Sequence, residues 1–367
     1  MFHKNKYPGA AGQPTEQRPE QKPEQKPEQK PGQKPGPQEA IATMTREQLL
    51  AGGKLALSRT LSLLEQNAQA VLPLLSDCYH HPAAQVLGIT GPPGVGKSSL
   101  LAELIIRYRT AGRTIGVIAV DPSSKRSGGA FLGDRVRFTT DPEDQGVFVR
   151  SMAARERLGG LADQTIAAMI LMRAVFDIVL IETVGVGQSE TDVSAVSDTV
   201  VFCVQPGSGD SLQFMKAGIA EIPHIALVTK ADMGGVAERT LADLRGALSL
   251  ACEGDNNWPV KVLGLSASEK QGLDGFISAV DAHYQWLCDN DKLSRQRGEQ
   301  AEQWLREAIR ELYGREGLTF VEKSLAANLL GREKGLLPQQ RSPFDVLADL
   351  RASMGFSWAE TAGTLPK

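Results

Sequence analysis

The stretch Gly91-Pro92-Pro93-Gly94-Val95-Gly96-Lys97-Ser98-Ser99-Leu100 decides the fold class of this chain of 367 residues. The spacing of its glycines, lysine and first serine is that of a phosphate-binding loop. An apolar run precedes it and an apolar-periodic segment follows it, so the loop joins an expected strand to an expected helix. Backbone N–H groups at such a junction bind phosphates. We predict that residues 91–99 hold nucleotide phosphates, with Lys97 at the β and γ phosphates and Ser98 as a ligand of Mg²⁺.

Short apolar runs alternate with helical stretches between Gln85 and Trp286. Runs of Val, Ile and Leu separated by helices indicate a mostly parallel sheet with helices on both faces. The expected fold class is therefore α/β, a phosphate-loop NTPase with helical extensions at both ends. The expected strands are residues 85–90, 114–120, 147–150, 176–183, 199–205, 224–230 and 260–267.

Composition divides the chain into four parts. Residues 1–38 repeat Pro-Glu-Gln-Lys and contain almost nothing apolar, which predicts a disordered tail outside the folded protein. Residues 39–84 have the leucine periodicity of one or two helices around Gly52 and Gly53. Residues 85–288 form the expected nucleotide-binding domain. Residues 289–367 are charged and helical, and we expect this C-terminal arm to mediate dimerisation.

Charge and cysteine usage exclude several classes of protein. The net charge of −3 gives no reason to expect nucleic acid or an anionic membrane as a partner. No apolar run approaches the roughly 18 residues of a membrane span, and the N-terminus has no apolar core of a signal peptide. The four cysteines are far apart, which suits a reducing compartment. We expect a cytoplasmic protein.

Three carboxylates at the ends of expected strands are candidates for a magnesium site. Asp121 and Glu182 each end an apolar run, and Asp134 lies in a loop beside a glycine. Glu182 stands three residues before Gly185, which is the spacing of the Asp-x-x-Gly element of GTPases. Gly185 would then offer its N–H group to the γ-phosphate. The expected catalytic set is Lys97, Asp134, Glu182 and Gly185. The expected metal ligands are Ser98, Asp121, Asp134 and Glu182.

The nucleotide base is expected to be guanine. Thr229-Lys230-Ala231-Asp232 follows an apolar run and is close to the Asn-Lys-x-Asp signature of GTPases. An aspartate at this position accepts two hydrogen bonds that guanine offers and adenine does not. Ser266 and Ala267 supply the usual backbone contact to the guanine oxygen. Thr229 lacks the amide that normally contacts the base and ties the loops together, so we expect weaker affinity for GTP and GDP.

Several strings resemble the MeaB/ArgK family, the GTPases associated with adenosylcobalamin-dependent methylmalonyl-CoA mutase, counterparts of the methylmalonic aciduria type A protein. They are "VDPSS", "FLGDRVR", "ETVGVGQSETDV" and "GDSLQFMKAG". The resemblance implies a SIMIBI-type G domain, a homodimer, and a GTP-dependent chaperone that gates cofactor loading of an acyl-CoA mutase and protects it. It also implies switch roles for Gln188, Asp210 and Lys216.

Departures from the family pattern indicate a divergent branch. Arg155 and Arg157 stand where the family has an uncharged stretch, and they are either solvent-exposed or contacts to phosphate or a partner. The sequence does not assign Gln188 or Asp134 as the residue that positions water. A metal-insertion GTPase of related fold stays open as an alternative, as does the ATP-dependent kinase or transport ATPase of older family labels.

Overall fold

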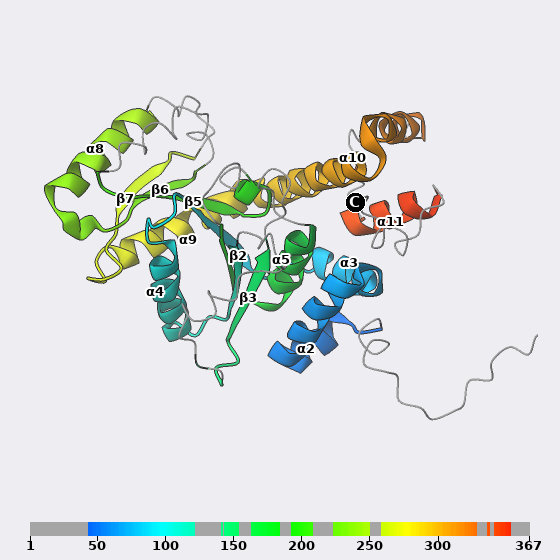
Figure 1. Cartoon of the computed structure of the whole chain (residues 1–367), viewed down its shortest axis with the longest axis horizontal. Coiled ribbons are helices and arrows are strands. Elements are labelled where there is room, and N and C mark those ends of the chain that lie inside the picture. Colours follow the sequence, from blue (N-terminus) through cyan, green and yellow to red (C-terminus); the bar gives the residue numbers. More distant parts are fainter. Residues whose placement is uncertain are drawn as a thin grey trace, which may run out of the picture. The chain divides into compact units, whose positions relative to one another are not determined.

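The computed structural model describes residues 43–121, 141, 143–153, 163–183, 192–207, 223–249, 258–328, 336–337 and 341–353 (Figure 1). The repeat tail and the two arginines of the divergent stretch, Arg155 and Arg157, lie outside the described residues. The predicted limits of the four parts of the chain stay predictions.

A parallel sheet of seven strands forms the centre of the described chain, with the strand order β3-β2-β4-β1-β5-β6-β7. Every neighbouring pair is parallel. Each predicted apolar run overlaps one strand, which confirms the predicted α/β class. The strands are β1 Gln85–Thr90, β2 Ile115–Asp121, β3 Val147–Ala153, β4 Ile178–Glu182, β5 Thr199–Val204, β6 Ile225–Val228 and β7 Lys261–Gly264.

Helices cover both faces of this sheet because alternate side chains of the strands are apolar on both sides. Leu87 and Ile89 of β1 belong to the core formed with α4 (Lys97–Thr110) and α9 (Leu273–Asp289). Val86 of the same strand belongs to the opposite core. That core is formed with α2 (Arg46–Gln66), α3 (Leu72–His80) and α5 (Asp163–Val175). A strand buried on both faces has the unbroken apolar sequence that is typical of parallel sheets.

The N-terminal helical segment forms as the leucine pattern predicts, with a break at one of its two glycines. Thr45 caps α2: its hydroxyl accepts from the N–H of Gln48, whose side chain accepts from the N–H of Thr45. Gly53 has φ 57° and ψ −147°, so the helix is kinked there. A short 3-10 helix, η1 (Ala68–Val71), then leads into α3.

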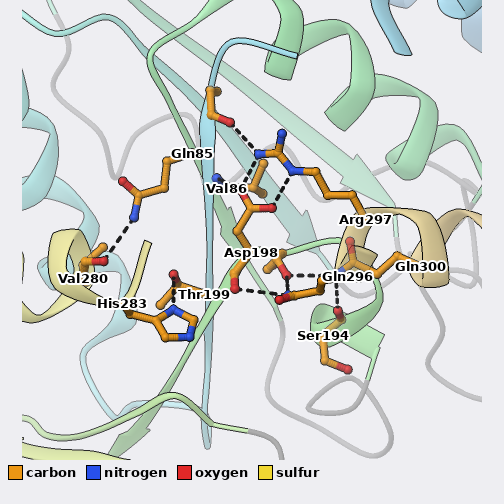
Figure 2. Close-up of polar contacts among 12 residues, drawn as sticks. Gln85, Val86, Ser194, Asp198, Thr199, Val280, His283, Gln296, Arg297 and Gln300 are labelled. Carbon is orange, nitrogen blue, oxygen red and sulfur yellow. Dashed lines mark hydrogen bonds and ion pairs between the residues drawn. The ribbon is translucent and has the colours of Figure 1, made fainter. Parts of the chain in front are cut away.

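The C-terminal part is helical in the described residues, with α10 (Lys292–Asn328) and α11 (Pro343–Ser353) following α9. Trp304, Leu305 and Ile309 of α10 are buried. Near its N-terminus, α10 is joined to the sheet by the ion pair between Arg297 and Asp198, 2.6 Å apart (Figure 2). Among the described helices, none combines the length and the apolar character that crossing a membrane requires.

Two histidines are packed together at the end of the sheet opposite the phosphate loop. The ring centroids of His224 and His283 are 4.1 Å apart. The N–H of Val200 donates to Nδ1 of His224 at 2.9 Å, and Nδ1 of His283 lies 2.8 Å from the Thr199 hydroxyl. Burial lowers the pKa of His224 to about 4 and also holds the pKa of His283 far below its ordinary value. Both rings are therefore neutral at physiological pH.

We expect the free energy of unfolding to fall as the pH is lowered from about 6.5 toward 4. The folded protein keeps His224 and His283 neutral in this range, whereas the unfolded chain protonates both rings and gains stability. Each ring contributes up to about 1.4 kcal/mol per pH unit. Urea unfolding monitored by circular dichroism between pH 7.5 and 5.5 measures the slope. The exposed His80 supplies the control, because His80→Gln should leave the slope unchanged, and a flat profile in the parent protein would contradict the assignment.

Candidate nucleotide-binding site

The phosphate loop is a tight turn that depends on its glycines. It leaves β1 at Gly91, whose φ is 137°, and enters α4 through Gly96, whose φ is 104°. A Cβ atom on Gly91 would lie 2.3 Å from the backbone oxygen of Cys203 in β5, so the neighbouring strand excludes any side chain there. These φ values favour glycine, and they turn the loop so that it ends at the N-terminus of a helix, where anions bind.

Lys97 is held beneath the loop. Its side chain is buried, and Nζ donates to the backbone oxygens of Gly91 at 2.7 Å and Pro92 at 3.1 Å. Both acceptors are neutral carbonyl oxygens. Charge-assisted bonds to phosphate are the stronger kind. The arrangement suits the predicted role of Lys97 at the β and γ phosphates.

Ser98 and Glu182 lie together, as the magnesium prediction requires. The Ser98 hydroxyl donates to Oε1 of Glu182 at 2.8 Å, although 84 residues separate them in the chain. The contact follows from strand pairing, because β1 and β4 are neighbours in which Ile89 is paired with Glu182. A hydroxyl and a carboxylate oxygen are the ligand types that Mg²⁺ prefers. The residues present fit this ion.

Thr229 corrects one expectation from the sequence. Its buried hydroxyl lies 2.6 Å from the carbonyl oxygen of Val95 in the phosphate loop and 3.1 Å from that of Val204 at the end of β5. Its N–H also donates to Val204 at 2.9 Å. The prediction that threonine cannot tie these loops together is therefore wrong, since its hydroxyl donates to Val95 while its N–H donates to Val204.

The remaining base-loop residues extend over the phosphate loop and toward solvent. Lys230 has a left-handed backbone with φ 52°, and its Nζ donates to the oxygen of Gly94 at 3.2 Å and to Oε1 of Gln205 at 3.0 Å. Asp232 lies in the 3-10 helix η5 (Ala231–Met233) and is exposed, which leaves its carboxylate available to a base. Gln205 was not predicted, and only its place directly after an apolar strand could have indicated it.

Ser266 and Ala267 lie beside the base loop through the pairing of β6 with β7. The N–H of Ala231 donates to the oxygen of Leu265 at 3.1 Å, which links the two loops. The Ser266 side chain is buried and bonds within its own turn, to the Ser268 hydroxyl at 3.0 Å and the N–H of Glu269 at 3.2 Å. This turn fixes the backbone that the sequence assigns to the guanine oxygen.

Other predicted residues are placed only in part. Pro92, Pro93 and Ser99 lie in or directly after the loop, and Asp121 is the last residue of β2, with nothing described of its side chain. Further predicted residues lie outside the described part of the chain, namely Asp134, Gly185, Gln188, Asp210 and Lys216. Cys203 is a buried thiol behind the loop, and burial raises its pKa to about 12.

The fold and these loops are those of a phosphate-loop nucleotide-binding protein of the GTPase class. The family model described as methylmalonyl-CoA mutase-associated GTPase MeaB matches residues 57–316. The chain belongs to this family. It is therefore a GTPase, which binds guanine nucleotides.

Known relatives agree with this assignment. A protein of Pyrococcus abyssi named for the same GTPase class is 38% identical over 267 residues, which are 72% of this chain and 82% of the relative. GTPase ArgK of Escherichia coli is 32% identical over 281 residues, 74% of this chain and 85% of the relative. The crystal structure of an LAO/AO transport system kinase superposes with a TM-score of 0.61 at 24% identity, covering 88% of this chain and 100% of that one. This structure shows that the fold is shared.

We expect Thr229→Val to speed the release of GDP by about tenfold, because the buried Val95 carbonyl loses its donor while the shape of the side chain is kept. Stopped-flow release of a fluorescent GDP measures the rate. Thr110→Val is the matched control, since this exposed hydroxyl bonds only the preceding turn of α4 in the described contacts. Wild-type release by a folded Thr229→Val protein would contradict the loop-tying role.

Proposed function

We propose that this GTPase is a nucleotide-dependent switch that acts as chaperone to an adenosylcobalamin-dependent acyl-CoA mutase, methylmalonyl-CoA mutase or a relative. Its role would be to gate cofactor loading and protect the enzyme. The family match over residues 57–316 carries the proposal, because that family is described by its association with methylmalonyl-CoA mutase. The placement of the phosphate loop beside Glu182 supports the switch.

In this proposal the loop residues 91–99 bind the phosphates and Lys97 neutralises their charge. Asp232 accepts from the guanine ring, and Lys230 lies along its plane. Thr229 contributes by holding the loops together, and the backbone at Ser266 and Ala267 meets the guanine oxygen. The left-handed conformation at Lys230 supports this arrangement, because it turns the chain so that Lys230 reaches Gly94 while Asp232 stays exposed.

Magnesium would be held by Ser98 and Glu182, with Asp121 and Asp134 as the further carboxylates. When bound, the ion neutralises charge that develops on the β and γ phosphates. Asp121 belongs to this set because β2 and β4 are neighbours with Ala119 paired to Glu182, so both strands end at the same edge of the sheet. The hydrogen bond from Ser98 to Glu182 keeps the first two ligands together.

The nucleotide state would be sensed by Gly185 through its N–H group at the γ-phosphate. Asp134 and Glu182 complete the catalytic set, and Gln188, Asp210 and Lys216 would pass the state to the mutase. The position of Glu182 and Thr183 beside the phosphate loop supports this, because Gly185 follows Thr183 by two residues in the sequence. We also propose a cytoplasmic homodimer formed through the C-terminal arm, residues 289–367.

The base assignment predicts that Asp232→Asn weakens GDP affinity by about a hundredfold and improves binding of xanthosine diphosphate. The asparagine amide cannot accept both guanine donors, but it can donate to the oxygen that xanthine carries in place of the amino group. Fluorescence titration with ATP as competitor measures both the affinity and the selectivity. Asp243→Asn, an exposed change on the neighbouring helix α8 (Gly235–Ser249), is the control. Retained GDP affinity in Asp232→Asn, or equal displacement by ATP, would contradict the assignment.

The partner assignment predicts capture of an acyl-CoA mutase that binds adenosylcobalamin. The full chain, loaded with a non-hydrolysable GTP analogue or with GDP, is immobilised and exposed to native extract, and captured proteins are identified by mass spectrometry. We expect different recovery of the mutase in the two states, and loss of that difference in Lys97→Ala, which cannot hold phosphates. Recovery of no cobalamin enzyme in either state would show that this chain serves another partner.

A further inference from the structure

Gln205 is the first residue after β5 and lies beside the loop that is proposed to bind the base. β5 and β6 are parallel neighbours in which Val204 is paired with Val228, so the two strands end at the same level of the sheet. The N–H of Thr229 donates to the oxygen of Val204 at 2.9 Å, which continues this pairing by one residue. Gln205 and Lys230 therefore leave the sheet next to each other.

The ammonium group of Lys230 has acceptors on two different segments of the described chain. Its Nζ donates to Oε1 of Gln205 at 3.0 Å and to the backbone oxygen of Gly94 in the phosphate loop at 3.2 Å. A free lysine side chain has many rotamers, and holding it in one of them costs conformational entropy. A single acceptor would leave the stem able to pivot about its end. Acceptors on two segments define where the ammonium lies, and with it the stem.

The segments that supply these two acceptors are both joined to Thr229, the neighbour of Lys230. In the phosphate loop, the oxygen of Val95 accepts from the Thr229 hydroxyl at 2.6 Å. At the end of β5, the oxygen of Val204 accepts from the Thr229 N–H. Val95 and Val204 are each next in the chain to one of the acceptors. The bonds of Thr229 therefore hold both acceptors within reach of Lys230.

The backbone that follows Gln205 is also anchored, by contacts with α8. The N–H of Gly207 donates to the Thr240 hydroxyl of that helix at 3.4 Å. A Cβ atom on Gly207 would lie 3.1 Å from a methyl carbon of Val236, so the chain passes close to the start of the helix. Gln205 thus lies between a strand end that is bonded to the base loop and a glycine that is packed on α8. Its side chain meets Lys230 from a fixed backbone.

We propose that Gln205 is a positioning residue for nucleotide binding. By accepting from Lys230, it holds the lysine stem where the methylene groups lie along the plane of the guanine base, and it thereby slows the release of the nucleotide. The left-handed backbone of Lys230 fits this role, because residues other than glycine keep such a conformation only where their surroundings impose it. This inference rests on the proposed function, which assigns residues 229–232 to the base.

The test separates the acceptor oxygen of Gln205 from the rest of its side chain. Gln205→Met keeps the length and removes the acceptor, whereas Gln205→Glu keeps an acceptor oxygen. Both variants lose the amide NH₂ group, so the difference between them measures the contact with Lys230. Gln285→Met is the matched control, because Gln285 is exposed on α9 and its amide donates to Asp289 of the same helix at 2.7 Å. Stopped-flow release of a fluorescent GDP from the full chain gives the rate for each variant.

We expect Gln205→Met to release GDP about fivefold faster than wild type, because a hydrogen bond from a charged group is lost. Gln205→Glu should release GDP at least about threefold more slowly than Gln205→Met for the same reason, and Gln285→Met should match wild type. Lys230→Met should release GDP at least about tenfold faster than wild type, and adding Gln205→Met to it should change the rate by less than about 1.5-fold, because the two residues act as one unit. Gln205→Leu serves if Gln205→Met does not fold.

Equal release rates in Gln205→Met and Gln205→Glu overturn this inference, because the acceptor oxygen would then not matter. An effect of Gln205→Met that persists in the Lys230→Met background also overturns it, because Gln205 would then act by another route. Wild-type release by Gln205→Met, together with fast release by Lys230→Met, removes the role of Gln205 alone. Wild-type release by Lys230→Met shows instead that this lysine does not contact the base, which is a failure of the proposed function.

Discussion

Parallel pairing of β1 between β4 and β5 is the constraint on which the rest of the structure depends. Parallel strands bring their carboxyl ends to one edge, so the phosphate loop after β1 lies beside Glu182 at the end of β4. The loop also passes so close to Cys203 of β5 that its first residue must lack a side chain. The pairing of the strands therefore also determines the position and the conformation of the phosphate loop.

The loop expected to bind the base, residues 229–232, depends in the same way on the pairing of β6 with β5. β6 is paired with β5, so Thr229 leaves β6 next to the end of β5 and meets both Val204 and the phosphate loop. The hydroxyl and the N–H of this one residue then join three segments that are far apart in the sequence. Lys230 adds a second link from the same loop, through Gly94 and Gln205. The two loops proposed to bind the phosphates and the base are thus joined to each other by contacts within the protein.

The sequence predicted what local patterns determine. Apolar runs placed the seven strands of the described residues. Motif spacing placed Lys97, Ser98 and Glu182 at one edge, because parallel strands end at the same edge of the sheet. It could not predict the reach of Thr229 or the contact of Gln205 with Lys230, since these depend on how loops from different strands meet. The prediction for Thr229 failed because it compared side-chain chemistry without the distance to Val95, which a hydroxyl can span.

The contacts of α10 show why polar pairs between residues far apart in the chain could not be predicted from the sequence. Asp198 and Arg297 are 99 residues apart, and neither belongs to a motif. Asp198 is nevertheless buried. Without Arg297, its buried charge would be left unpaired beside the start of β1. Burial by itself lowers the pKa of Arg297, but the hydrogen bonds and charge of Asp198 outweigh it and raise that pKa, so the guanidinium stays charged. One strand, β1, thus leads into the phosphate loop at its carboxyl end and lies beside the ion pair that holds α10 at its amino end.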